Sequence, residues 1–306
     1  MKTPDATPLP KPRDQVPPPP GTGIEELKFF HGAFSQVGER HEKSNLPNQD
    51  AFLSMPEQGI FGIFDGVGGH QAGEVASAAS RDFMQERALE MLPQGIPEEE
   101  KKQVAENLFL ETHRLLLAEG QKDLERHGMA TTASLALFEN AGPETWALLA
   151  AQVGDSRISI LRADGALDQL TIDDTYAAIE FLKKEGWDEE KLRDLQARAG
   201  RDELTREELN TFLRLGNILN SGLGGGSNFD GKPKFYSATL HKGDIVILGS
   251  DGLFHGLTER ELIEIIRASG DNLEQAAKLL VLRARVSERT KDDLTVVLTR
   301  PCSSEK

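Results

Sequence analysis

The stretch Ile60-Phe61-Gly62-Ile63-Phe64-Asp65-Gly66 decides how the rest of the chain is interpreted. A short apolar run that stops at an acidic residue and a glycine is typical of a buried strand ending in a turn. A second such run, Ala51 to Met55, comes just before it, and the residues between them are the turn-like Pro56-Glu57-Gln58-Gly59. The two runs therefore predict a β-hairpin.

Outward from this hairpin, strand-like and helix-like segments come in clusters. Helices are expected at 72–91 and 97–126, with Pro97 in a first turn. Further helices are predicted by three capping-box patterns, Thr205…Glu208, Thr258…Glu261 and Asp271…Glu274. Strands are expected at 131–138, 146–153, 158–162, 234–240, 244–248 and 294–299. Regular βαβ alternation is lacking, so the sequence predicts an α+β sandwich with mostly antiparallel sheets.

Composition narrows the class of protein. The chain has 306 residues, 38% hydrophobic and 28% charged, with a formal net charge of −15. Such acidity argues against a nucleic-acid partner, which needs clustered Lys and Arg. We find no run near the roughly 18 apolar residues of a membrane helix, and no secretory signal. The single cysteine, Cys302, indicates a reducing compartment, so we expect a cytoplasmic protein.

Two segments differ from the rest of the chain. Residues 1–22 are rich in proline and poor in core-forming side chains, which predicts a disordered tail. This tail serves as a spacer or binds a proline-recognising partner. Residues 24–301 are expected to form the folded domain. Within it, the segment 174–232 is charged and helical, then Gly-rich at Gly222 to Gly226.

Acidic residues recur where apolar runs begin or end. Each of them alone is better interpreted as a turn residue, because Asp is disfavoured inside strands and common beside them. Together, strand ends of one sandwich can meet in one cleft, where carboxylates need hard cations such as Mg²⁺ or Mn²⁺. No His or Cys pattern for zinc is present. The acidic positions are Asp50, Asp65, Asp155, Asp251, Asp292 and Asp293.

The motifs around these residues resemble those of the metal-dependent PPM-type (type 2C) serine/threonine protein phosphatases, in their bacterial form. The resemblance runs from about Ser35 to Thr299, and its weight lies in the order and spacing of six motifs that are weak singly. They are Asn48-Gln49-Asp50, Phe64-Asp65-Gly66-Val67-Gly68-Gly69-His70, Ala130-Thr131-Thr132-Ala133, Val153-Gly154-Asp155-Ser156-Arg157, Ser250-Asp251-Gly252 and Asp292-Asp293-Leu294-Thr295-Val296-Val297.

The resemblance implies a four-layer α-β-β-α sandwich with two, possibly three, Mn²⁺ or Mg²⁺ ions between the sheets. It implies that Asp65 bridges two ions, with the Gly66 carbonyl on one of them and with Asp251 and Asp292 on the other. Asp50 would orient a bound water, and Asp155 would join Asp251 at a third, weaker site. The implied reaction is hydrolysis of phosphoserine or phosphothreonine in a protein substrate by an ion-activated water. We expect a monomer.

Several positions depart from the family pattern. Val67 stands where many members have a histidine proposed as the general acid, which leaves a bound water or His70 to protonate the leaving group. The phosphate-contacting arginine is replaced by Asn45, and Arg40 is the best substitute, ahead of His41 and Lys43. Asp293 replaces a frequent asparagine and is expected to add negative charge beside the metals. His255 occupies the place of a further acidic ligand of the third metal.

Three alternatives stay open at this stage. The segment 174–232 occupies the place of the family's flap, and is either a gating lid or a plain surface insertion. The departures also allow a pseudophosphatase that acts as a regulatory binding module, or a phosphatase for small metabolites. A dinucleotide loop at Gly66-Val67-Gly68-Gly69 is excluded, because Gln71 stands at the last glycine position and the βαβ context is missing.

Overall fold

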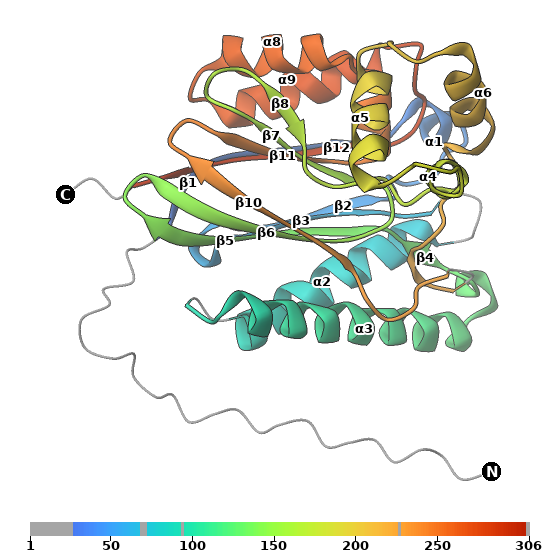
Figure 1. Ribbon diagram of the computed structural model, residues 1–306. Coiled ribbons are helices and arrows are strands. Elements are labelled where there is room, and N and C mark those ends of the chain that lie inside the picture. The colour runs from blue at the N-terminus through green and yellow to red at the C-terminus, as the bar shows by residue number, and fades with distance from the viewer. Residues whose placement is uncertain (1–26, 68–71, 93–94, 226–227, 304–306) are drawn as a thin grey trace.

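The computed structural model describes residues 27–67, 72–92, 95–225 and 228–303 (Figure 1). The predicted tail, residues 1–22, and His70 lie outside these residues. None of the described helices combines the length and the apolar composition needed to cross a membrane.

Two antiparallel five-stranded sheets form the centre of the molecule. A small pair, β4 (Ala130–Thr131) and β9 (Leu223–Gly224), lies apart from them. The first sheet has the order β1 (Lys28–Gln36), β12 (Leu294–Cys302), β11 (Ile245–Gly249), β7 (Arg157–Leu161) and β8 (Leu167–Gln169). The second has the order β10 (Lys234–His241), β6 (Thr145–Val153), β5 (Ala133–Gly142), β3 (Ile60–Asp65) and β2 (Asp50–Met55).

Helices cover the outer face of each sheet, as Figure 1 shows. Those over the second sheet are α2 (Gly73–Met91) and α3 (Glu98–Lys122), and those over the first are α8 (Glu259–Ser269) and α9 (Leu273–Arg285). The expected four-layer α-β-β-α sandwich is confirmed.

Strand β3 shows why its sequence is apolar almost throughout. Phe61 and Ile63 belong to the core between the two sheets, whereas Ile60 and Phe64 belong to the core under α2 and α3. A strand covered on both faces has no need of polar alternation. Phe61 also packs edge-on against Phe138 of β5, with ring centroids 5.7 Å apart.

The predicted hairpin is confirmed, with β2 and β3 joined by the short 3₁₀ turn Pro56–Gln58. The helix predicted at 97–126 ends earlier, at Lys122, and a separate 3₁₀ turn follows at Leu124–Arg126. Asp123 divides the two, because its side chain accepts a hydrogen bond from the Glu125 amide and caps the new turn. Pro97 is the N-cap residue and not part of the first turn.

Other predictions need correction. The strand predicted at 131–138 is divided at Thr132, since Ala130–Thr131 pair with Leu223–Gly224 while β5 begins at Ala133. Part of the Gly-rich stretch is therefore strand β9. The capping boxes at Thr205 and Thr258 are confirmed. The one at Asp271 is wrong, because Asn272 caps α9 and its side chain accepts from the Gln275 amide.

Among the described elements, those that the sequence did not predict include the edge strands β1 and β8, the short strand β9 and the short helices α1 (Glu39–Lys43) and α7 (Asp251–Gly256). The segment 174–232 contains the helices α4 (Tyr176–Leu182), α5 (Glu189–Gly200) and α6 (Arg206–Leu215) as well as β9. Its helical character is as expected, and its role as a flap stays a prediction.

Candidate metal centre

Asp50 and Asp65 lie side by side because of the hairpin register. Asp50 is the first residue of β2 and Asp65 the last of β3, and the two are direct partners in the antiparallel pair. Directly opposed side chains in a sheet lie about 5 Å apart, so two carboxylates here repel each other unless a cation lies between or beside them. The hairpin turn thus fixes the first pair of the site.

Asp251 reaches the same end of the sandwich through Ser250. The Ser250 amide donates to the Thr295 carbonyl at 3.1 Å, and the Thr295 amide donates back to Ser250 Oγ at 3.1 Å. This reciprocal pair fixes the end of β11 against the start of β12, which follows Asp292. The expectation that Asp251 ends a strand is wrong in detail, because β11 ends at Gly249 and Asp251 is the first residue of α7.

Asp155 enters from the second sheet. It follows β6 and precedes Arg157, which pairs with Gly249 of β11. Burial raises the pKa of the Asp155 carboxyl well above its usual value, and the charge of Asp251 adds to the effect. The two carboxylates that the resemblance assigned to a third ion are therefore neighbours.

Asp65 lies at the centre of the group. Burial raises the pKa of its carboxyl well above the usual value, and the charges of Asp50, Asp251, Asp155 and Asp292 raise it further, in that order. The charges of four carboxylates therefore act on the fifth. The structure thus brings Asp65, Asp155, Asp251 and Asp292, which the sequence analysis proposed as ligands, together with Asp50, which it expected to orient a water.

The Asp50 carboxylate is polar, buried and unpartnered. Both of its oxygens are inaccessible and neither has a hydrogen-bond partner among the described residues. Burial raises the pKa of Asp50 to about 8. The hydroxyls of Thr295 and Ser250 offset part of this effect, but neither makes a well-formed hydrogen bond with it. An all-oxygen donor set with orphaned carboxylate oxygens fits hard divalent cations and the waters they carry.

Two glycines allow the backbone to close around these carboxylates. A Cβ on Gly66 would lie 2.4 Å from the Gly73 carbonyl oxygen and 2.7 Å from the Gln49 carbonyl oxygen. A Cβ on Gly252 would lie 2.2 Å from the Asp293 carbonyl oxygen. The glycine after each aspartate is thus required by close backbone approach, which is a physical reason for the two Asp-Gly pairs in the sequence.

Arg40 is a partly exposed cation beside Asp292. It lies on α1, with half of its side chain exposed, and its Nη2 donates to Asp292 Oδ1 at 3.3 Å. Burial and the charge of Asp251 raise the pKa of Asp292, and the Arg40 guanidinium lowers it in part. The structure therefore places Arg40 beside a predicted metal ligand. Asn45 is exposed in the loop after α1, with φ at 54°.

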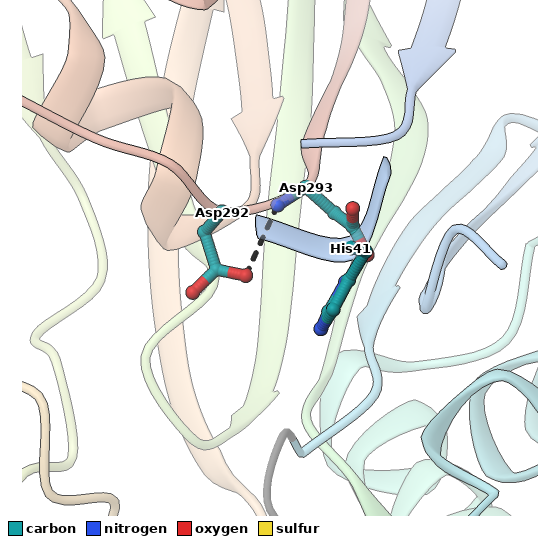
Figure 2. Close-up of side chains that lie close together, drawn as sticks. All are labelled: His41, Asp292 and Asp293. Carbon is teal, nitrogen blue, oxygen red and sulfur yellow. Dashed lines mark hydrogen bonds and ion pairs between the residues drawn. The ribbon is translucent and has the colours of Figure 1, made fainter. Parts of the chain in front are cut away.

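Asp293 differs from what the sequence suggested. Its carboxylate is buried and accepts hydrogen bonds from the Gly38 amide at 2.6 Å, the Gln49 amide at 2.6 Å and His41 Nδ1 at 2.8 Å. Figure 2 shows the Asp292 carboxylate and the His41 ring on either side of Asp293. Asp293 is thus a structural anchor, although its charge still raises the pKa of Asp50.

The remaining positions have these places. His255 Nδ1 lies 3.7 Å from Asp251 Oδ2, one helical turn along α7. The Val67 amide donates to the Ala130 carbonyl, and its side chain is half-buried.

The sequence analysis did not identify the role of Thr132, which holds the backbone of Asp65 in place. Its Oγ1 accepts from the Asp65 amide at 3.0 Å, and its amide donates to the Asp65 carbonyl at 2.8 Å. The Thr131-Thr132 motif was its signal.

Comparison with known proteins identifies the family. The profile of the protein phosphatase 2C family matches residues 37–288. The chain belongs to this family. Its relatives include the serine/threonine phosphatase stp of Listeria innocua, which is 26% identical over 271 residues that cover 88% of this chain and 95% of that protein. Protein phosphatase PhpP of Streptococcus pneumoniae is 28% identical over 233 residues, covering 76% and 82% of the two chains.

Solved structures of this family share the fold. The serine/threonine phosphatase PstP/Ppp of Mycobacterium tuberculosis superposes with a TM-score of 0.65 at 23% identity, covering 90% of this chain and 98% of that one. Stp1 of Staphylococcus aureus gives a TM-score of 0.65 at 22% identity, covering 92% and 98%. The catalytic domain of PstP in complex with two manganese ions gives 0.62 at 23% identity, covering 90% and 100%.

Proposed function

We propose that this phosphatase hydrolyses phosphoserine and phosphothreonine in protein substrates, with Mn²⁺ or Mg²⁺ as cofactor. The observation that carries the proposal is the convergence of four carboxylates on Asp65 while both Asp50 oxygens stay unpartnered. Such a group is stable at neutral pH when cations bind to it. Relatives named as serine/threonine phosphatases, and a neighbour in complex with two manganese ions, support the same conclusion.

We assign each residue of the metal centre a role from its position. Asp65 would hold two ions, the Gly66 carbonyl would contribute to one of them, and Asp251 and Asp292 would hold the other. Asp155, beside Asp251, contributes to a third, weaker site. When bound, the cations lower the pKa of a water and offset charge on the phosphoryl oxygens. The oxygens of Asp50, which have no hydrogen-bond partner among the described residues, would accept hydrogen bonds from a water and orient it.

Arg40 is the phosphate anchor in this proposal. Its side chain is half exposed, and among the described residues its guanidinium makes contacts of 3.3 and 3.4 Å at one nitrogen, which leaves its other donors available to phosphate oxygens. Guanidinium groups suit this task because they donate in a planar fork. Val67 has no proton to give, so we assign protonation of the leaving oxygen to a water in the site.

Two alternatives are less well supported. A pseudophosphatase would be expected to lose metal ligands, whereas all five predicted carboxylates are present and close together. A phosphatase for small metabolites has no specific observation in its favour. We further propose that residues 24–301 form the phosphatase domain, that 174–232 serve as its flap, and that the protein is monomeric and cytoplasmic, with 1–22 as a tail.

One experiment separates these possibilities. Hydrolysis of an aryl phosphate and of a phosphothreonine peptide is measured with Mn²⁺, with Mg²⁺ and with EDTA, for wild type and Asp251→Asn. We expect metal-dependent release from both substrates, abolished by the substitution. The matched control is Asp82→Asn, an exposed carboxylate on α2. Metal binding without turnover of either substrate would support the regulatory module, and turnover of the aryl phosphate alone would support the metabolite phosphatase.

A further inference from the structure

We propose that His41 and Asp293 form a positioning pair that orients Arg40 toward the phosphate site. The proposal rests on the proposed function in one respect, the phosphate contact of Arg40. Neither His41 nor Asp293 touches substrate or metal in this scheme. Their contribution reaches the reaction through the guanidinium of Arg40.

Asp293 closes the loop that carries Arg40. Its Oδ1 accepts from the Gly38 amide and its Oδ2 from the Gln49 amide, so one carboxylate binds both ends of the segment 38–49. The Arg40 amide also donates to the Lys291 carbonyl at 2.9 Å. A helix as short as α1 is not stable by itself, so it depends on these hydrogen bonds for its stability.

The hydrogen bond to Asp293 fixes the tautomer of His41. An ionised carboxylate only accepts hydrogen bonds, so His41 Nδ1 must carry the proton that it donates over 2.8 Å. In the neutral ring the opposite nitrogen, Nε2, then has a free lone pair. Arg40 Nη2 lies 3.4 Å from it and donates to it. Orientation of a working group through the second nitrogen of a histidine is a common arrangement in protein sites.

Arg40 therefore has two acceptors at one nitrogen. Nη2 donates one hydrogen to His41 Nε2 and the other to Asp292 Oδ1, at 3.4 and 3.3 Å. An arginine that is half exposed would otherwise sample many rotamers and lose that conformational entropy when it binds a ligand. The two acceptors hold its orientation before phosphate arrives, and this leaves the outer edge of the guanidinium free.

A competing explanation is a metal site at the same residues. Ligand atoms of His41, Asp292 and Asp293 lie within 4.8 Å of one another. However, His41 Nδ1 and the Asp293 carboxylate already bind each other, and both side chains are almost fully buried, at 5% and 3% exposure. The remaining nitrogen, Nε2, faces the positive charge of Arg40. A cation bound there would displace the hydrogen bonds of His41 with Asp293 and of Arg40 with His41 and Asp292. The positive charge of Arg40 would also repel it.

The first test measures the tautomer without any catalysis. Imidazole ¹⁵N NMR of the metal-free protein in EDTA distinguishes an Nδ1-protonated from an Nε2-protonated ring. We expect the Nδ1–H form for His41. An Nε2–H ring would overturn the proposal, because Nε2 would then be a donor facing the Arg40 donors. The exposed His127 serves as the reference resonance.

The second test is a double-mutant cycle. In His41→Asn the amide nitrogen still donates to Asp293, so the loop stays closed, but the acceptor for Arg40 is lost. We expect kcat/KM for a phosphothreonine peptide to fall about fivefold, mainly through KM. In an Arg40→Met background the same substitution should have almost no effect on kcat/KM. His127→Asn is the matched control and should be neutral.

The outcomes distinguish the role of His41 from the proposed phosphatase function. An equal loss from His41→Asn in both backgrounds would show that His41 acts on the loop alone, and would overturn the proposal. If the wild type hydrolysed neither the aryl phosphate nor the phosphothreonine peptide, the proposed function would be wrong. The NMR measurement would still decide whether His41 Nε2 accepts a hydrogen bond from Arg40.

Discussion

Asp50 and Asp65 are direct partners across β2 and β3, so the hairpin places two carboxylates in opposition at the end of the sheet. This arrangement is unfavourable in the free protein and favourable once a cation binds. Function and stability therefore oppose each other at this site in the absence of metal, as is common for sites that hold clustered charge.

Asp65→Asn should separate these two effects. In EDTA at pH 7 we expect the variant to be more stable than wild type by about 1–2 kcal/mol, a rise of a few °C in Tm, because the cost of burying an ionisable carboxyl and its repulsion from four carboxylates are removed. With Mn²⁺ the order should reverse, since wild type gains binding free energy and the variant does not. Thermal unfolding with and without Mn²⁺ measures both. Asp82→Asn, at an exposed ion pair, should change neither value.

Gly66→Ala tests the close backbone approach beside Asp65. The added methyl would lie 2.4 Å from the Gly73 carbonyl oxygen, so the backbone must move and we expect a loss of about 1–3 kcal/mol in unfolding free energy. Gly200→Ala is the control, because no atom lies within 4 Å of its added Cβ and it ends helix α5. Urea unfolding of both variants tests this prediction. Equal stability of Gly66→Ala and wild type would mean that a glycine is not sterically required at position 66.

Much of the site was predictable from the sequence for a simple reason. Asp65 and Asp251 interrupt apolar runs, and a charged residue at the end of a buried strand is visible without a structure. The role of Asp293 was not, because its partners Gly38, His41 and Gln49 lie some 250 residues away along the chain. Asp292 and Asp293 are adjacent in the bend before β12 yet have different partners, Arg40 for the first and the segment 38–49 for the second.

The fold was predictable to a similar degree. Strand β3 is apolar on both faces and was recognised, whereas β1 is an edge strand whose burial does not alternate and was missed. The choice between Asp271 and Asn272 as the cap of α9 depends on a shift of one residue, which packing decides and local sequence does not.

His255 provides a test of the proposed third metal site. Its Nδ1 lies 3.7 Å from Asp251 Oδ2, and Asp251 neighbours Asp155. His255→Asp adds a carboxylate at this place, and an extra oxygen donor with negative charge should tighten the weakest Mn²⁺ site about tenfold. Calorimetric titration with Mn²⁺ measures this affinity. The control is His127→Asp, because His127 is exposed and directly follows the 3₁₀ turn Leu124–Arg126. This variant should leave the Mn²⁺ affinity unchanged. An unaltered isotherm for His255→Asp would exclude His255 from the site.

Glu208 tests how the segment 174–232 is stabilised. Its carboxylate accepts from Arg198 Nη1 and Nη2 at 3.0 and 2.8 Å, and from the Thr205 amide at 2.7 Å. The Arg198 hydrogen bonds lower the pKa of Glu208 from 4.5 to about 2. A depressed carboxyl pKa stabilises the fold above the unfolded value of 4.5, and the contribution is lost as pH falls toward 2.

Glu208→Gln should therefore reduce the unfolding free energy by about 1 kcal/mol at pH 7, after allowance for solvent screening of a pair near the surface. The deficit should be smaller at pH 3.5, where part of the wild-type contribution is already gone. Urea unfolding at the two pH values measures it. The adjacent Glu207→Gln is the matched control, because Glu207 is 81% exposed and contacts only Lys184 among the ion pairs described. A deficit that does not change with pH would show that the capping geometry, and not the charge of Glu208, stabilises α6.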